Sequence, residues 1–73
     1  MKDRSDVTNI EFEIEDCVFF RNITQSIFYI EHGCKIIDLF VDSNHKLVFV
    51  FLKSDHKKVI DLWMKNKENH IFK

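Results

Sequence analysis

The segment that most constrains the fold is Leu47–Leu52, where six apolar residues follow one another as Leu-Val-Phe-Val-Phe-Leu. Valine and phenylalanine are typical of β-strands, in which successive side chains point to opposite faces. The two sets of side chains are Leu47, Phe49 and Phe51 on one face and Val48, Val50 and Leu52 on the other. A strand that is apolar on both faces lies in the centre of a sheet and is covered on both sides, by its own chain or by a partner. We expect Phe49 and Phe51 to share one layer of the core.

The chain is short for the apolar surface it has to bury. Its 73 residues provide one domain near the lower size limit for a single core. Eight phenylalanines argue against a disordered chain. A domain this small has difficulty burying all of its apolar surface, which favours an interaction module. Gly33 is the only glycine, so no glycine-rich phosphate loop is present.

A first helix is predicted over residues 23–32. Asn22 is a candidate N-cap, and Gln25 three residues later completes a capping-box pattern. Gly33 follows the periodic segment, at the position where a left-handed C-cap is needed. The residues expected to form its buried stripe are Ile23, Ile27 and Ile30, widened by Phe28 and Tyr29.

A hairpin and a second helix are predicted after the first helix. Lys35–Val41 and Lys46–Lys53 have the composition of strands, and the polar segment 42–45 between them is typical of a hairpin turn. Ser54 is a candidate cap for a helix that runs through about Lys67. The buried stripe expected for this helix comprises Val59, Ile60, Leu62, Trp63 and Met64.

The leading segment Ile10–Glu15 alternates apolar and acidic residues, which predicts a strand with one buried face and one acidic face. The apolar parity continues through Val18 and Phe20 and is broken only at Asp16. Either Ile10–Arg21 is one long strand with a bulge or kink near Asp16, or two short strands meet there. We expect the long strand, because Glu-Asp is a poor two-residue turn, and we expect its first half to extend beyond the core.

Together these elements predict an α+β fold with the order β-α-β-β-α, an antiparallel sheet and a leading acidic strand. Residues 1–73 form a single domain. Within it, residues 1–9 are a candidate for disorder and residues 68–73 are expected to be a frayed tail.

A series of structural motifs runs through residues 18–66. They are Phe19-Phe20-Arg21-Asn22 before a helix, His32-Gly33 at its end, Lys35-Ile36-Ile37, the strand Leu47–Phe51, and Trp63 in a short charged helix. In these motifs the segment resembles a family of small domains of unknown function found in Firmicutes and their phages. The resemblance implies a Firmicute or mobile-element origin, such as a phage-encoded protein. It brings no catalytic or ligand-binding residue with it.

No enzyme, metal site or cofactor is expected. The chain has four histidines and two cysteines. Zinc sites pair ligands two to four residues apart and repeat the pair, whereas His32 and Cys34 have one residue between them and no second pair follows. The same His32 and Cys34 are the only candidates for a nucleophile and its base, and their spacing does not predict contact.

A cytoplasmic location is expected, which is the host cytoplasm if the protein is phage-encoded. Cys17 and Cys34 are too few for a disulfide framework and fit buried thiols in a reducing compartment. Met1–Asp16 is acidic and lacks the apolar core of a signal peptide. The apolar runs are shorter than the roughly 20 residues that span a membrane.

Charge is unevenly distributed along the chain. Residues 1–16 contain six acidic and two basic residues, whereas residues 53–73 contain six lysines and three acidic residues. Such a separation of charge can steer a partner.

The protein-interaction residues predicted on the leading strand are Glu11, Phe12, Glu13, Ile14 and Glu15. Exposed strand edges recruit other strands, and an acidic row can occupy a basic groove on a target.

The function expected is therefore that of a small non-enzymatic protein-interaction module. It is either a homodimeric accessory protein or an anti-defence inhibitor of a host defence or nucleic-acid-processing protein. The alternative is a small nucleic-acid-binding protein that uses the aromatic hairpin and a lysine-rich helix. The lysines in question are Lys53, Lys57, Lys58, Lys65 and Lys67. A net charge of −1 disfavours this alternative.

Overall fold

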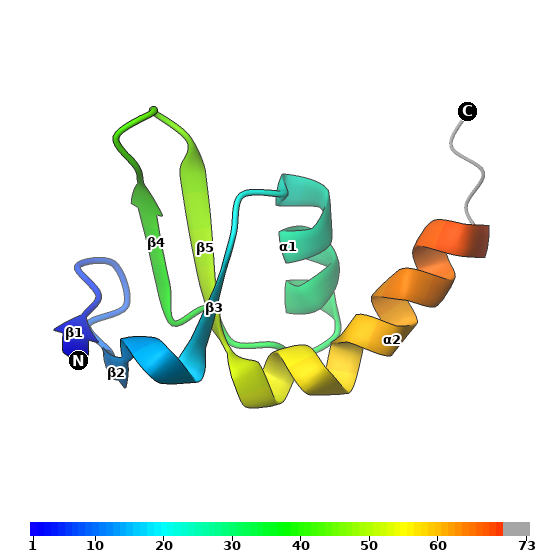
Figure 1. The fold of residues 1–73 in the computed structure, drawn as a ribbon, viewed down its shortest axis with the longest axis horizontal. Helices are drawn as coiled ribbons and strands as arrows, with labels where there is room; N and C mark the ends of the chain where they lie inside the picture. The colour runs from blue at the N-terminus through cyan, green and yellow to red at the C-terminus, as the bar shows by residue number, and fades with distance from the viewer. Residues whose placement is uncertain (70–73) are drawn as a thin grey trace.

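The computed structural model describes residues 1–69, and the predicted frayed tail falls outside this range from residue 70 onward. The chain forms a mixed α+β domain with two antiparallel sheets and two α-helices (Figure 1). The fold class predicted from the sequence is confirmed.

A three-stranded antiparallel sheet forms the centre of the domain. It consists of β3 (Cys17–Phe20), β5 (Leu47–Leu52) and β4 (Asp38–Val41), in the order β3-β5-β4. The doubly apolar strand is therefore central, as predicted, and its four inner residues are buried. Strand β4 begins three residues later than expected.

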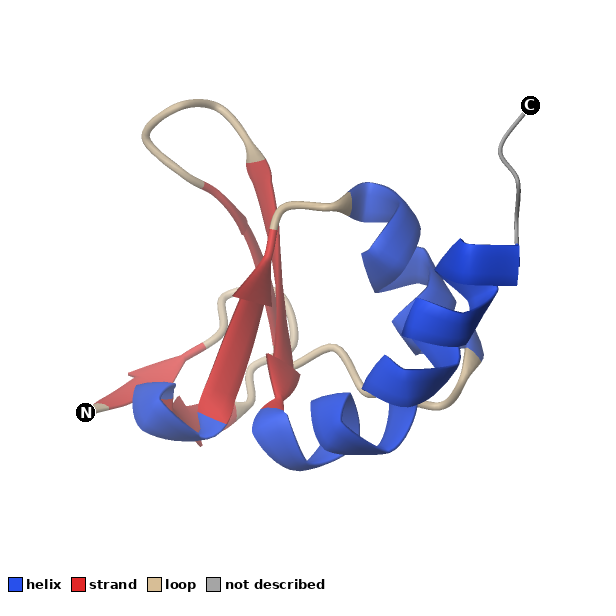
Figure 2. Cartoon of the chain, turned by 45° about the vertical axis from the view of Figure 1, so that its right-hand side comes forward, coloured by secondary structure: helices blue, strands red, loops and turns tan. Residues whose placement is uncertain are grey.

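Both helices lie on one face of this sheet (Figure 2). Helix α1 spans Ile23–Glu31, and helix α2 spans Lys53–Asn69 and begins directly where β5 ends. Ser54 therefore lies in the first turn of α2 and is not the residue that precedes it. The buried cluster beneath the helices comprises Tyr29, Cys34, Phe49, Phe51, Val59 and Trp63. Phe49 and Phe51 share one core layer, as predicted.

The opposite face is covered in part by the N-terminal segment. Strands β1 (Lys2–Arg4) and β2 (Glu11–Glu13) pair antiparallel, and a 3-10 turn over Ile14–Asp16 leads into β3. The second buried cluster comprises Phe12, Cys17, Ile37 and Val50.

The predicted long strand is wrong, because β2 and β3 belong to different sheets. A period of two residues indicates which side chains share a face, but it does not show that the backbone stays extended throughout. The turn at Ile14–Asp16 allows β2 to leave the plane of the main sheet and to pair with β1. Phe12 then packs in the same cluster as Val50. The expectation that this segment extends beyond the core is therefore wrong.

Residues 1–9, which the sequence analysis treats as a candidate for disorder, are held by hydrogen bonds to the first residue of β4 and to the residue before it. The Ser5 hydroxyl donates to Asp38 Oδ1 at 2.6 Å and accepts from the backbone N–H groups of Val7 and Thr8. The Thr8 hydroxyl donates to the carbonyl oxygen of Ile37 at 2.6 Å. These bonds satisfy the polar groups of a turn that would otherwise be costly to bury.

Asp42 organises the connection between β4 and β5. Its Oδ1 accepts from the backbone N–H groups of Asn44 and Lys46, and its Oδ2 accepts from Arg21 Nε at 2.7 Å. The Lys46 N–H, together with the Arg21 guanidinium, lowers the pKa of this carboxyl group. The ion pair ties the end of β3 to the hairpin turn across β5.

The caps of α1 agree with the sequence in part. Asn22 Oδ1 accepts from the backbone N–H of Gln25 at 3.1 Å, as expected for an N-cap. The Gln25 side chain does not reach back to close a capping box, and it donates to the Tyr29 hydroxyl at 3.4 Å. Gly33 has the positive φ predicted for a C-cap, at 92°.

Replacing Gly33 with alanine is expected to lower the free energy of unfolding by about 1 kcal/mol or more. A Cβ at this position would meet nothing within 4 Å, so the loss comes from backbone strain alone. Urea unfolding followed by circular dichroism measures it. The exposed helical substitution Thr24→Ala is the control, and it should change the stability by less than about 0.5 kcal/mol. If Gly33→Ala is as stable as the wild type, the prediction of backbone strain at this position is wrong.

Candidate protein-interaction site

The three isoleucines of the stripe predicted for α1 face outward, which corrects the prediction that they pack in the core. The other two residues of that stripe agree with it, because Tyr29 is buried and Phe28 packs against the core cluster. Ile23, Ile27 and Ile30 are 52%, 48% and 38% exposed. We call these three residues the isoleucine stripe. The residues that α1 buries completely are Ser26 and Tyr29.

Tyr29 decides which side of α1 meets the sheet. Its ring lies edge-on to Phe20, with the centroids 5.3 Å apart, and packs against Phe51 at 5.6 Å. Its hydroxyl group is 2.8 Å from His56 Nδ1, so the buried phenol has a polar partner. Ser26, one turn earlier, is small and satisfies its own hydroxyl by donating to the Asn22 carbonyl oxygen. Burying this face leaves the isoleucine stripe on the outside.

A groove between α1 and α2 adjoins the isoleucine stripe. Its volume is about 600 Å³, and its lining residues are Thr24, Ile27, Phe28, Glu31, His32, Trp63 and Asn66. Phe28 forms an aromatic wall, because it stacks on His32 at 4.0 Å and meets Trp63 edge-on at 5.3 Å. Ile27 belongs both to the stripe and to the wall of the groove. The stripe and the groove therefore form one continuous surface.

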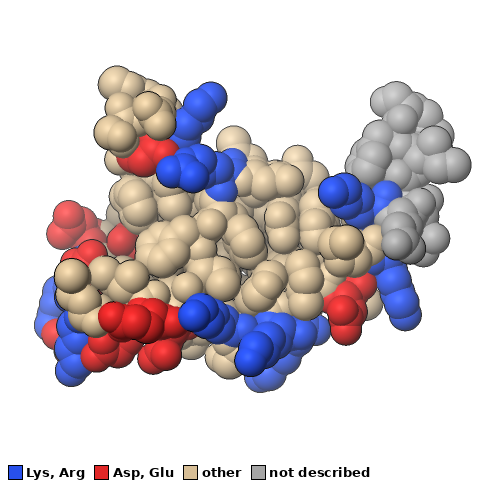
Figure 3. Space-filling model, viewed as in Figure 1, with Lys and Arg blue, Asp and Glu red and all other residues tan. Residues whose placement is uncertain are grey.

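This surface carries little charge. Among the nine residues of α1, Glu31 at the end is the only charged residue, although charged residues make up 32% of the chain. In the view of Figure 3, acidic and basic side chains gather at the rim of the face, and the middle of it is free of them. An apolar surface with so few charges near it is suited to contact with another protein.

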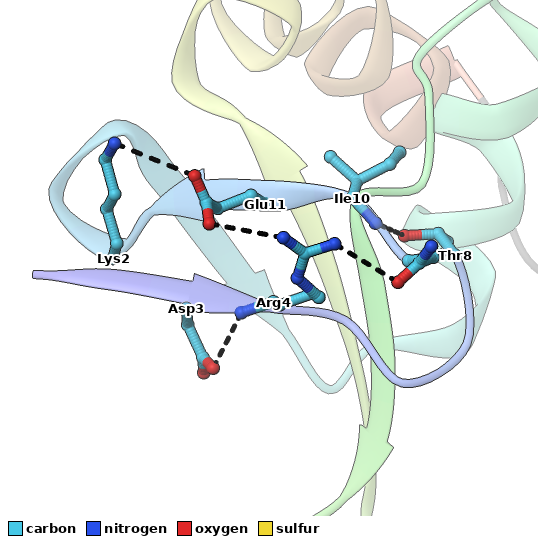
Figure 4. A network of polar contacts seen from close by, with 7 residues as sticks. Lys2, Asp3, Arg4, Thr8, Ile10 and Glu11 are labelled. Atoms are coloured by element: carbon cyan, nitrogen blue, oxygen red, sulfur yellow. Dashed lines mark hydrogen bonds and ion pairs between the residues drawn. The ribbon is translucent and has the colours of Figure 1, made fainter.

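The acidic row predicted to meet a partner is paired within its own chain. Glu11 lies 3.4 Å from the Arg4 guanidinium and 3.7 Å from the Lys2 ammonium group (Figure 4). The amino group of Met1 pairs with Glu13 at 3.3 Å and also with Glu15, and it lowers the pKa of the Glu15 carboxyl group. Cations on and beside β1 therefore neutralise the row.

Phe12 and Ile14 do not form the partner-facing edge that the alternation predicts. Phe12 is buried by its own chain, and Ile14 is half-buried against the same cluster. One edge of β2 is already paired with β1. The hypothesis that a partner buries these two side chains is corrected, because their apolar contacts are made within the chain.

The five lysines of the nucleic-acid alternative all lie on the exposed surface of α2. Lys53 and Lys57 are four residues apart and share one face of the helix, whereas Lys58 and Lys65 share another. Asp61 is three or four residues from Lys57, Lys58 and Lys65, so an acidic residue lies among them. The lysines are brought onto one helix but not into one basic face.

The side chains of His32 and Cys34 turn to different partners. His32 Nδ1 lies 2.8 Å from the carbonyl oxygen of Phe28, and Cys34 Sγ lies 3.7 Å from the carbonyl oxygen of Asp55. Within residues 1–69, no group of three or more histidine, cysteine or acidic side chains is placed to hold a metal ion.

Three buried weak acids predict a loss of stability at alkaline pH. Burial raises the pKa of the Cys17 and Cys34 thiols above 9.0 and that of the Tyr29 phenol above 10.0. Their stabilising effect is fully present below the unfolded pKa values and is lost as the pH rises through the higher folded values. We expect the urea midpoint to fall between about pH 8 and pH 11 in reducing buffer. The variant Cys17→Ala/Cys34→Ala should show a smaller fall, and an equal fall would exclude the thiols as its cause.

Sequence reasoning missed three exposed apolar features. The first is the isoleucine stripe. The second is the pair Phe19 and Phe40, whose rings meet edge-on at 6.5 Å on the sheet face opposite the helices. The third is on α2, where Leu62 and Met64 are 50% and 47% exposed, which corrects the prediction that they belong to its buried stripe. The near absence of charge on α1 was a signal for the first. For Phe19 and Phe40 the sequence offers no signal, because strand parity does not show how far the N-terminal segment covers the sheet.

The comparisons with protein-family models, curated proteins and solved structures find no match to this chain. No helix within residues 1–69 is long and apolar enough to cross a membrane.

Proposed function

We propose that this chain is a small, non-enzymatic protein-interaction domain whose working surface is the isoleucine stripe together with the adjoining groove. The observation that carries the proposal is the orientation of α1. The helix turns three isoleucines toward solvent, and Glu31 is the only charged residue among its nine residues.

The exposed stripe is large on the energy scale of so small a domain. Complete burial of one isoleucine side chain stabilises by about 1.5–3 kcal/mol, so covering three that are roughly half exposed would contribute about 2–4 kcal/mol. A chain of this length has a total stability of about 4–11 kcal/mol. The free energy that covering the stripe would contribute is therefore a large fraction of the free energy of unfolding of the whole domain. Contact with a protein partner gives that surface a use.

The partner that we infer is a protein, either a second copy of the chain or another protein. The finer version of the proposal, an anti-defence inhibitor of a host protein, is supported by the resemblance of residues 18–66 to domains of Firmicutes and their phages. Nucleic-acid binding is not proposed, because the lysines of α2 do not form one face and lie around Asp61.

The proposed function is tested by placing a charge on the stripe. Ile30 is 38% exposed, so the variant Ile30→Asp should still fold, with some loss of stability that urea unfolding measures. It should lose contacts that the wild type makes, measured as self-association by sedimentation and as specific partners captured on the immobilised domain. Leu62→Asp, at an exposed position of α2, is the control and should keep those contacts. If Ile30→Asp keeps every contact of the wild type, the stripe is not a working surface and the proposal fails.

A further inference from the structure

The isoleucine stripe has a spacing that suits pairing with its own copy. Ile23 lies four residues before Ile27, and Ile30 lies three residues after it. With a rise of 1.5 Å per residue, these side chains are about 6 Å and 4.5 Å from Ile27 along the helix axis. Reversing the helix about Ile27 therefore exchanges the places of Ile23 and Ile30 to within about 1.5 Å. This is the condition for a self-complementary contact about a two-fold axis.

We infer that the occupant of the stripe is a second copy of this chain, with the two α1 helices antiparallel and Ile27 at the two-fold axis. Ile23 of each copy then lies opposite Ile30 of the other. The inference rests on the proposed function and names the partner for the same surface. It predicts an isologous homodimer in which each copy covers the other's stripe.

The position of the single charge on α1 favours this antiparallel pairing. A two-fold axis brings identical residues together, so a self-pairing surface must keep like charges apart. Glu31 is four residues from Ile27, at the end of the helix. In the antiparallel arrangement the two Glu31 residues lie on opposite sides of the two-fold axis, about 12 Å apart along the direction of the helices. That separation exceeds the screening length of about 10 Å at 0.1 M salt.

The groove supports the same arrangement. Ile27 forms part of its wall, beside the aromatic ring of Phe28. A second copy seated on the stripe therefore also covers the open side of the groove at that wall. The second copy would then shield from water the apolar wall of the groove, which α1 and α2 of the same chain leave open to solvent.

The size of the surface sets the strength of the expected dimer. Helix α1 has nine residues, so it is about 14 Å long. The surface that two such helices bury between them belongs to the smallest class of protein interfaces, below about 1,200 Å² in total. Interfaces of this size give weak and transient complexes. We expect self-association in the micromolar range or weaker, with monomer and dimer in rapid exchange.

Sedimentation of the full chain over micromolar to near-millimolar concentrations tests the inference. The wild-type mass should rise from monomer toward dimer. In Ile27→Asp, two carboxylates would meet at the axis, and dimerisation should weaken by about 100-fold or more. The matched control is Met64→Asp on α2, because Met64 is 47% exposed and Ile27 is 48% exposed. Met64→Asp should dimerise as the wild type does, and circular dichroism should show that all three proteins are folded.

Cross-linking tests the register independently of stability. In Ile27→Cys, two thiols would meet at the axis, and mild oxidation should join the copies through a disulfide that a reductant cleaves. Met64→Cys should form no disulfide-linked dimer under the same conditions, because its thiols lie away from the axis. The natural thiols Cys17 and Cys34 are buried and should not contribute.

Two results overturn the inference: a wild type that stays monomeric at all concentrations, or a dimer that Ile27→Asp leaves unchanged. These failures are distinguishable from failure of the proposed function. A monomeric wild type that binds a different protein, with loss of that contact in Ile30→Asp, rejects self-pairing and supports the interaction domain. If neither Ile27→Asp nor Ile30→Asp loses any contact of the wild type, both the self-pairing and the proposed function are rejected.

Discussion

Replacing Phe51 with alanine is expected to lower the free energy of unfolding by about 3–5 kcal/mol, the usual loss for a buried phenylalanine. Phe51 is fully buried and belongs to β5, the central strand of the sheet. Its ring packs against Tyr29 at 5.6 Å and Phe20 at 6.0 Å, so the truncation removes contacts to both α1 and β3. Because the whole domain has about 4–11 kcal/mol of stability, the variant should be largely unfolded or close to it.

Urea unfolding followed by tryptophan fluorescence measures this loss, since Trp63 belongs to the same cluster. The matched control is Phe40→Ala, which removes a phenylalanine from the edge strand β4 where it is partly exposed. It should cost less than half as much. A Phe51→Ala protein with nearly wild-type stability would mean that β5 is not the centre of the core.

Replacing Phe12 with alanine is expected to cost about 3 kcal/mol and to loosen the N-terminal segment from the sheet. Phe12 is buried with Cys17, Ile37 and Val50, and it is the residue of β2 that enters this cluster. Hydrogen bonds from Ser5 and Thr8 hold the rest of the segment, so the loss should be partly local. This experiment separates a core role for the leading strand from the partner-facing role that its alternation suggested.

Thiol labelling distinguishes local loosening from global unfolding. Cys17 packs in the cluster with Phe12, whereas Cys34 lies in the cluster beneath the helices. In Phe12→Ala, Cys17 should react faster with a small alkylating reagent while Cys34 stays protected. Phe19→Ala, on the same sheet face but exposed, is the control and should leave both thiols protected. Equal protection of Cys17 in Phe12→Ala and the wild type would show that the segment does not depend on this side chain.

The sequence alone determined the features that local chemistry controls. Leu47–Leu52 had to be central, because a strand with two apolar faces is stable only when both are covered. Asn22 and Gly33 set the ends of α1, since an N-cap needs a side-chain acceptor and a C-cap needs a residue that tolerates positive φ. These requirements depend on a few neighbouring residues, and the sequence contains all of them.

Only the tertiary structure decided which faces are buried. Periodicity identified the isoleucine stripe as the apolar side of α1, but Tyr29 is buried because Phe20, Phe51 and His56 form a site for its ring and hydroxyl group. Residues distant in the sequence make that site, so no local pattern contains it. The N-terminal segment behaves likewise, because Ser5 meets Asp38 across 33 positions of the chain. The candidate site exists because these long-range contacts fill the core with other side chains and leave Ile23, Ile27 and Ile30 outside it.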